Sequence, residues 1–130
     1  MLLFWIILAI AVGFTIYVRA APSQVERWHV PLTFSEDKTF KRGVQRVVRG
    51  DLAALDHIIM ASGAMVLDGS VEDGHVTYIS RSKVVGFPDY TTVVEEDGTL
   101  RIYARLRFGR SDLGVNRARV DRWIDALQAR

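Results

Sequence analysis

The C-terminal quarter of the sequence is rich in arginine. Residues 101–130 contain eight arginines and three acidic residues, whereas residues 50–100 contain two basic and nine acidic residues. The planar guanidinium group of arginine donates paired hydrogen bonds to the oxygens of a carboxylate or a phosphate. This segment therefore predicts an anionic ligand, such as a phosphate, a carboxylate or a lipid headgroup.

A glycine-bordered loop lies inside this basic segment, between Gly109 and Gly114. It leads into a helical pattern that Ser111, Asp112 or Asn116 could cap. Free N–H groups at a helix start, with arginines nearby, form an anion site. The alternative is that Asp112 only caps the helix while an arginine braces the loop through a carboxylate pair. The predicted ligand-binding residues are Arg105, Arg107, Arg110, Ser111, Asn116 and Arg117.

A second polar group, Arg81 and Ser82, comes shortly before the run Phe87-Pro88-Asp89. A proline between an aromatic residue and an aspartate indicates a rigid turn that could contain a cis peptide bond. We expect Asp89 to act as the carboxylate partner of an arginine from the C-terminal motif over 108–119. The predicted supporting residues are Asp89, Asp112, Arg81, Ser82, Pro88, Gly109 and Gly114.

The sequence contains no enzyme or metal signature. It has no cysteine, and the spacing of His29, His57 and His75 is not that of metal ligands. We therefore expect no metal and no cofactor, and a binding function rather than catalysis. The alternative is a hydrolase or transferase for a lipid-linked or anionic substrate, with Ser82 or Asp112 in the chemistry. The small net charge of +2 and the apolar leader argue against a nucleic-acid partner.

These residues require a scaffold of strands and helices, and the patterns predict an α+β domain. Apolar and polar residues alternate most clearly over 100–108, which places Arg105 and Arg107 on one face of a strand. Helical spacing predicts helices over 52–62 and 114–128. Turn signals separate the strands, which implies a mostly antiparallel sheet of about five strands, covered on one face by the two helices. The predicted strands cover 39–48, 64–71, 75–83, 90–95 and 100–108.

The first 18 residues carry no charged side chain. As a helix they would rise about 27 Å, close to the thickness of a bilayer core. We predict a transmembrane anchor over 1–19, a juxtamembrane linker over 20–38 with Trp28 at the membrane surface, and a domain over 39–130. The weak cleavage-like triplet at 18–20 keeps a signal peptide as the alternative. The two arginines that follow, Arg19 and Arg27, favour a cytoplasmic domain, but a hydrophobic N-terminal segment can also export the domain behind it.

Two segments resemble an uncharacterised bacterial and plastid family, domain of unknown function 1499. They are TYISRSKVVGFPDY over Thr77–Tyr90 and RLRFGRSDLGVNRARVDRW over Arg105–Trp123. The resemblance covers about 51–130 and implies no established activity. Because some relatives resemble lumenal or lipid-anchored envelope proteins, it favours a periplasmic domain on a bacterial inner membrane. Many relatives carry a serine where this chain has Leu106, so a role of that serine would not transfer.

Together these observations predict a single-pass membrane protein with a binding or accessory domain. The expected partners are the lipid bilayer, an anionic envelope ligand and a membrane protein complex. A purely structural accessory subunit of such a complex is a further alternative.

Overall fold

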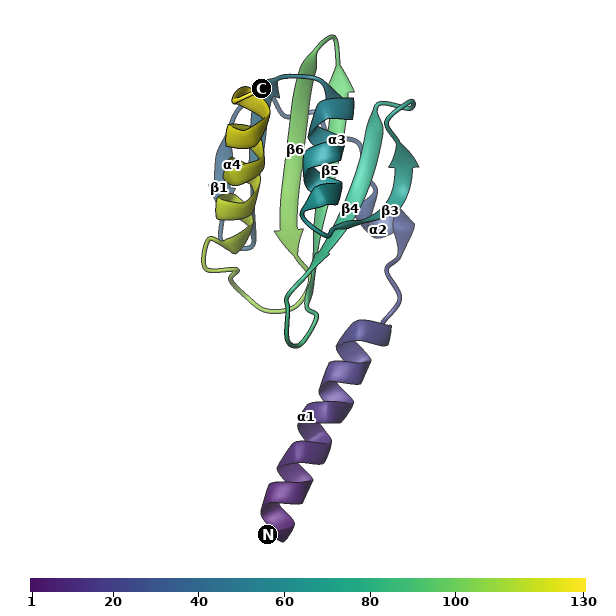
Figure 1. The fold of residues 1–130 in the computed structure, drawn as a ribbon, viewed down its shortest axis with the longest axis vertical. Coiled ribbons are helices and arrows are strands. Elements are labelled where there is room, and N and C mark those ends of the chain that lie inside the picture. Colours follow the sequence, from purple (N-terminus) through teal and green to yellow (C-terminus); the bar gives the residue numbers. More distant parts are fainter.

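A six-stranded antiparallel sheet forms the centre of the domain in the computed structural model, which describes residues 1–130 (Figure 1). The strands lie in the order β1-β2-β6-β5-β4-β3. The predicted α+β class with an antiparallel sheet is confirmed, with one strand more than expected. The strands are β1 (Lys38–Phe40), β2 (Gly43–Arg49), β3 (Met65–Ser70), β4 (His75–Arg81), β5 (Pro88–Glu96) and β6 (Thr99–Leu106).

The additional strand comes from the region predicted as a single strand over 39–48. That prediction was wrong, because the chain turns at 41–42 and β1 pairs with β2 as a hairpin. The alternating pattern continues across the turn and hides it. Gly43 begins β2 against β6, where a Cβ atom would collide with the carbonyl oxygen of Ala104. A glycine is needed for this close approach of two backbones.

Two helices, α3 (Leu52–Ala61) and α4 (Val115–Gln128), cover one face of the sheet (Figure 1). Their bounds agree with the predicted helices to within one residue. Asp51 caps α3, since its carboxylate accepts a hydrogen bond from the backbone N–H of Ala54 at 3.1 Å. The apolar stripes of both helices and the inward residues of the strands form one core, which includes Leu55, Ile59 and Trp123. We call this side of the sheet the helix face.

The segment 21–37 crosses the opposite side of the sheet, which we call the linker face. It contains a short helix, α2 (Val25–Trp28). Trp28, for which the sequence predicts a place at the membrane surface, is buried against the domain and stacks on Tyr90 with ring centroids 3.9 Å apart. Further along, the carbonyl of Phe34 accepts a hydrogen bond from Arg101 at 2.7 Å. The interval predicted as a linker therefore packs against the sheet.

The helix α1 (Leu2–Ala20) projects away from the domain (Figure 1). It is long and apolar enough to cross a membrane, and almost none of it is buried. Its C-terminal turns contact two loops of the domain. Phe14 packs on Phe87 with ring centroids 5.9 Å apart, and Arg19 donates to the carbonyl of Val84 at 3.1 Å. Tyr17 approaches Phe108 in the same way at 6.4 Å. The loops 82–87 and 107–114 therefore lie at the end of the domain that carries α1.

Candidate functional site

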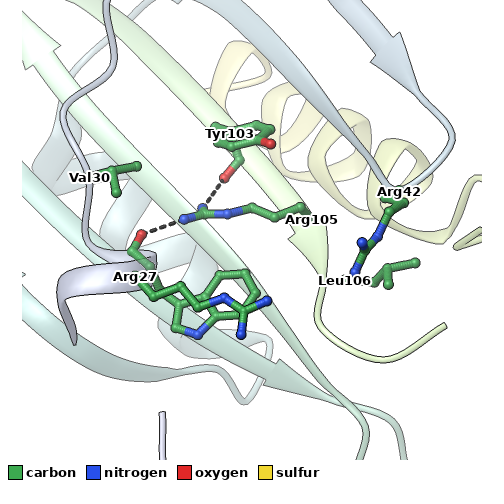
Figure 2. A pocket seen from close by; sticks show the side chains of 7 residues that line it. Arg27, Val30, Arg42, Tyr103, Arg105 and Leu106 are labelled. Atoms are coloured by element: carbon green, nitrogen blue, oxygen red, sulfur yellow. Dashed lines mark hydrogen bonds between the residues drawn. The ribbon is translucent and has the colours of Figure 1, made fainter. Parts of the chain in front are cut away.

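Arg105 on β6 is the most enclosed arginine of the chain, and it lies on the linker face. Its guanidinium group donates to Thr92 Oγ1 at 2.9 Å and to the carbonyl of Tyr103 at 3.0 Å. A third hydrogen bond goes to the carbonyl of Trp28, in the segment that crosses this face (Figure 2). The side chain also lies over the rings of Trp28 and Tyr103. Arg105 thus joins β5, β6 and the N-terminal segment.

The positive charge of Arg105 has no carboxylate partner. All three acceptors of its hydrogen bonds are neutral oxygens, and it forms no ion pair. Burial lowers the pKa of Arg105 to about 10, and the nearby Tyr103 and Tyr90 oppose that change. At neutral pH the group is still charged. A buried charge without a counter-charge is costly, so an anion beside this group would be stabilised.

A cavity of about 280 Å³ adjoins Arg105. Two further arginines border it and are exposed at its rim. The guanidinium of Arg27 lies over the Trp28 ring at 4.7 Å, and Arg42 donates to the carbonyl of Arg107 at 3.3 Å. No acidic residue is among the lining residues (Figure 2). They are Arg27, Trp28, Val30, Arg42, Tyr103, Arg105 and Leu106.

Arg107 shares the linker face with Arg105, as the alternation predicts. It does not line the cavity. Its guanidinium group donates to the carbonyl of Pro22 at 2.9 Å and to the hydroxyl of Tyr90 at 3.1 Å. It also lies over the ring of Phe108. Arg107 therefore fastens the start of the N-terminal segment to the sheet.

The loop before α4 is organised by Asp112. Its carboxylate accepts from the backbone N–H groups of Gly114 at 2.8 Å and Asn116 at 3.1 Å. Asp112 therefore caps the start of α4, as the alternative interpretation of the sequence predicts. Ser111 accepts a hydrogen bond from the backbone of Leu113. The predicted ligand residues Arg110 and Arg117 are exposed and make no hydrogen bond or ion pair within the chain.

Asp89 pairs with an arginine of the C-terminal segment, and that arginine is Arg119. The two side chains are 3.0 Å apart and mostly buried on the helix face. Burial raises the pKa of Asp89, and the hydrogen bond and charge of Arg119 act against this rise. Asn116 is fully buried there and accepts from Arg119 at 3.0 Å. Asn116 is therefore separated by the sheet from Arg105, and the two do not share a site.

Arg81 and Ser82 hold the loop between β4 and β5. The Ser82 hydroxyl accepts from the backbone N–H groups of Gly86 at 3.0 Å and Phe87 at 2.9 Å, and Arg81 donates to the carbonyl of Gly86. The peptide bond before Pro88 is trans, so the cis bond considered from the sequence is not present. No histidine contacts Ser82. His29 and His75 instead stack on each other on the linker face, with ring centroids 3.8 Å apart.

The sequence profile of the family described as "Protein of unknown function (DUF1499)" matches residues 19–127. The chain belongs to this family. No curated protein and no solved structure matches the chain. The match begins at Arg19, whereas the sequence resemblance extended only from about residue 51. This wider range agrees with the packing of the segment 21–37 on the sheet of the DUF1499 domain.

Several residues that line the cavity beside Arg105 are not among the predicted site residues. Arg27 and Trp28 lie in the predicted linker, and Arg42 lies in the predicted strand over 39–48 but occupies a turn. Thr92 carries a signal that was available, because it alternates with Tyr90 along β5 and so shares the face of Arg105. No local pattern indicates that Trp28 folds back onto that face, since it lies 77 residues from Arg105 in the chain.

Proposed function

We propose that this DUF1499 chain is a single-pass protein of a bacterial inner membrane whose periplasmic domain binds an anionic ligand in the cavity beside Arg105. One observation carries the proposal: a buried guanidinium group is neutralised by no carboxylate and borders a cavity with two more arginines. The chemical class of ligand that suits this site is a carboxylate or a phosphate.

The electrostatics of the cavity favour that class of ligand. Three positive charges converge on about 280 Å³ that has no acidic lining residue. Arg105 is already positioned by three hydrogen bonds, so little side-chain entropy is lost when an anion binds beside it. Arg27 and Arg42 are exposed at the rim and can adjust to the ligand. The small volume suits a compact group rather than a polymer.

The helix α1 supports the membrane part of the proposal. Its 19 residues would rise about 28 Å and present apolar side chains along their length. Arg19 is its only charged side chain and lies at the end next to the domain. The periplasmic side of the proposal is supported only by the resemblance of some members of the family to envelope proteins.

Binding of inorganic phosphate and of acetate to the full chain tests the proposal. The chain is placed in nanodiscs of phosphatidylcholine, and each anion is titrated by calorimetry. We expect saturable binding that weakens at least tenfold in the double variant Arg27→Gln/Arg42→Gln, which retains Arg105 and the fold. The matched control is Lys41→Gln/Arg130→Gln, because both side chains are exposed and without internal partners.

A third variant distinguishes the cavity from the loop before α4. Arg110→Gln/Arg117→Gln removes two exposed arginines outside the cavity. Loss of anion binding in this variant, with binding retained in Arg27→Gln/Arg42→Gln, would move the site to the loop and refute the cavity. Equal weakening in the control would show a general charge effect and would also refute it.

A further inference from the structure

A second, larger cleft of about 610 Å³ lies on the helix face, between the end of α3 and the start of α4. It is separated from the Arg105 cavity by the sheet. Its floor is apolar and includes Ile58 and Trp123, and the exposed Val115 also lines it. A volume in this range is typical of sites for small organic molecules.

The polar side of this cleft is cationic. Arg81, Lys83, Arg119 and Arg122 border it, and no acidic residue does. Arg119 is paired with Asp89, and Arg81 donates to a backbone carbonyl. Lys83 and Arg122 are exposed and make no side-chain hydrogen bond or ion pair within the chain. Two free positive charges therefore stand beside an apolar floor.

A buried hydroxyl group in the cleft lacks a partner. Ser80 lines the cleft, and its Oγ atom is buried without any hydrogen bond. Buried hydroxyl groups in proteins are almost always hydrogen-bonded, so an isolated one calls for an explanation. Rotation of the Ser80 side chain toward the cleft would let a polar ligand group supply the missing hydrogen bond.

The cleft opens at the end of the domain that carries α1. Figure 1 shows that α3 ends and α4 begins on this side. Lys83 connects the cleft with α1. Its side chain borders the cleft, and its carbonyl accepts a hydrogen bond from Arg19 at the end of α1. Phe87, from the same loop, packs on Phe14, six residues before the end of α1. If α1 spans a bilayer, this loop therefore lies beside the last ~9 Å of the helix, where the chain leaves the bilayer.

From this geometry we infer that the cleft between α3 and α4 binds an anionic membrane lipid, with the headgroup at Lys83 and Arg122 and an acyl chain against Trp123. The inference uses the membrane anchor of the proposed function but is independent of the Arg105 cavity. A zwitterionic lipid fits less well, since the cleft provides no acidic residue for its cationic group.

Fluorescence quenching of Trp123 tests this inference in the full chain. The variant Trp5→Phe removes the tryptophan of α1, and the further variant Trp5→Phe/Trp123→Phe measures the signal of Trp28 on the other face. Each is placed in nanodiscs of phosphatidylcholine that contain a fixed fraction of lipid brominated in its acyl chains. We expect brominated phosphatidylglycerol to quench Trp123 at least twofold more than brominated phosphatidylcholine does.

Two double variants in the Trp5→Phe background complete the test. Lys83→Gln/Arg122→Gln should abolish the preference for phosphatidylglycerol, whereas the charge-matched Lys41→Gln/Arg130→Gln should retain it. Equal quenching by the two lipids, or a preference that survives in Lys83→Gln/Arg122→Gln, would overturn the inference.

A final arm distinguishes a lipid from a free anion. Inorganic phosphate is titrated into discs of phosphatidylcholine alone. Phosphate binding that depends on Lys83 and Arg122, with no lipid-specific quenching, would show a site for a free anion and would refute the lipid. The variant Arg27→Gln/Arg42→Gln should leave the quenching unchanged, so failure of this inference is separable from failure of the Arg105 cavity.

Discussion

The two faces of the sheet each bury an arginine, but they neutralise it in different ways. On the helix face Arg119, a residue of α4, lies 3.0 Å from the carboxylate of Asp89, and α4 contributes Val120, Trp123 and Ile124 to the apolar core. On the linker face Arg105 has only the neutral oxygens of Thr92, Tyr103 and Trp28. The charge of Arg119 is therefore neutralised within the chain, whereas the charge of Arg105 is not, and the proposed anion would supply the counter-charge.

We expect the largest effect on stability from removal of the carboxylate in the Asp89–Arg119 pair. Asp89→Ala leaves Arg119 buried without its carboxylate, and we expect it to reduce the free energy of unfolding by about 3 kcal/mol. Urea unfolding of the full chain in detergent, followed by tryptophan fluorescence, measures this loss.

A second pair on the helix face provides the control. Asp121 pairs with Arg46 at 3.0 Å, but its side chain is 46% exposed. Asp121→Ala should therefore cost less than ~1 kcal/mol. Similar losses in the two variants would show that the Asp89–Arg119 pair is no more important than a surface ion pair.

Removal of the unpaired arginine should have a smaller effect on stability. Arg105→Met removes three hydrogen bonds, although Thr92 Oγ1 still donates to the carbonyl of Trp28, and it also removes a buried charge that has no counter-charge. We expect a loss of about 2 kcal/mol in the same unfolding experiment. A loss of stability larger than that of Asp89→Ala would contradict the comparison. It would mean that hydrogen bonds to three neutral oxygens stabilise the charge of Arg105 as well as a carboxylate does.

The two faces also differ in how far sequence patterns predict them. The helix face follows from local signals: the apolar stripes of α3 and α4, the Asp51 cap and the alternation along β6 all agree. Alternation also places Arg105 and Arg107 on the opposite face. It does not reveal what covers them, because the contact between Arg105 and Trp28 spans 77 residues and depends on a segment that resembles a linker.

The residues that the sequence predicts as one site lie on opposite faces of the sheet. Sequence proximity grouped Arg105 with Asn116, yet the sheet separates them. The hypothesis of an arginine partner for Asp89 agrees with the observed Asp89–Arg119 pair. The register of β5 against β6 places Asp89 on the face of the sheet that α4 covers. The cavity residues Arg27 and Arg42 come from a short helix and a hairpin turn, and neither has a strong local pattern.

Binding of phosphate to the linker face should raise the free energy of unfolding of the folded domain by mass action. At a phosphate concentration ten times its dissociation constant, we expect the free energy of unfolding to rise by about 1.4 kcal/mol. The rise should disappear in Arg27→Gln/Arg42→Gln and persist in Lys41→Gln/Arg130→Gln. Stabilisation that persists in Arg27→Gln/Arg42→Gln would place the anion elsewhere, and the contrast between the two arginines would lose its functional meaning.

The smallest effect should be a pH dependence that belongs to the linker face. Burial lowers the pKa of His29 below its usual 6.5, and the neighbouring His75 lowers it further, whereas Asp68 and Asp73 raise it. Because the unfolded chain then binds a proton more readily than the folded one, the stabilisation is complete above pH 6.5. It is lost as the pH falls through the lower folded value.

His75→Phe tests this contribution. Phenylalanine retains a ring that can stack on His29, but it removes the imidazole charge and the hydrogen bond from His75 Nε2 to the carbonyl of Val30, so the pH dependence and not the absolute stability is compared. The loss of stability between pH 7.5 and pH 5.5 should therefore be smaller in His75→Phe than in the wild type, and smaller than the effect of phosphate. His57→Gln is the matched control, because it removes an exposed histidine of α3, on the other face of the sheet from His29. An unchanged pH dependence in His75→Phe would mean that the charge of His75 does not contribute to the lowered pKa of His29.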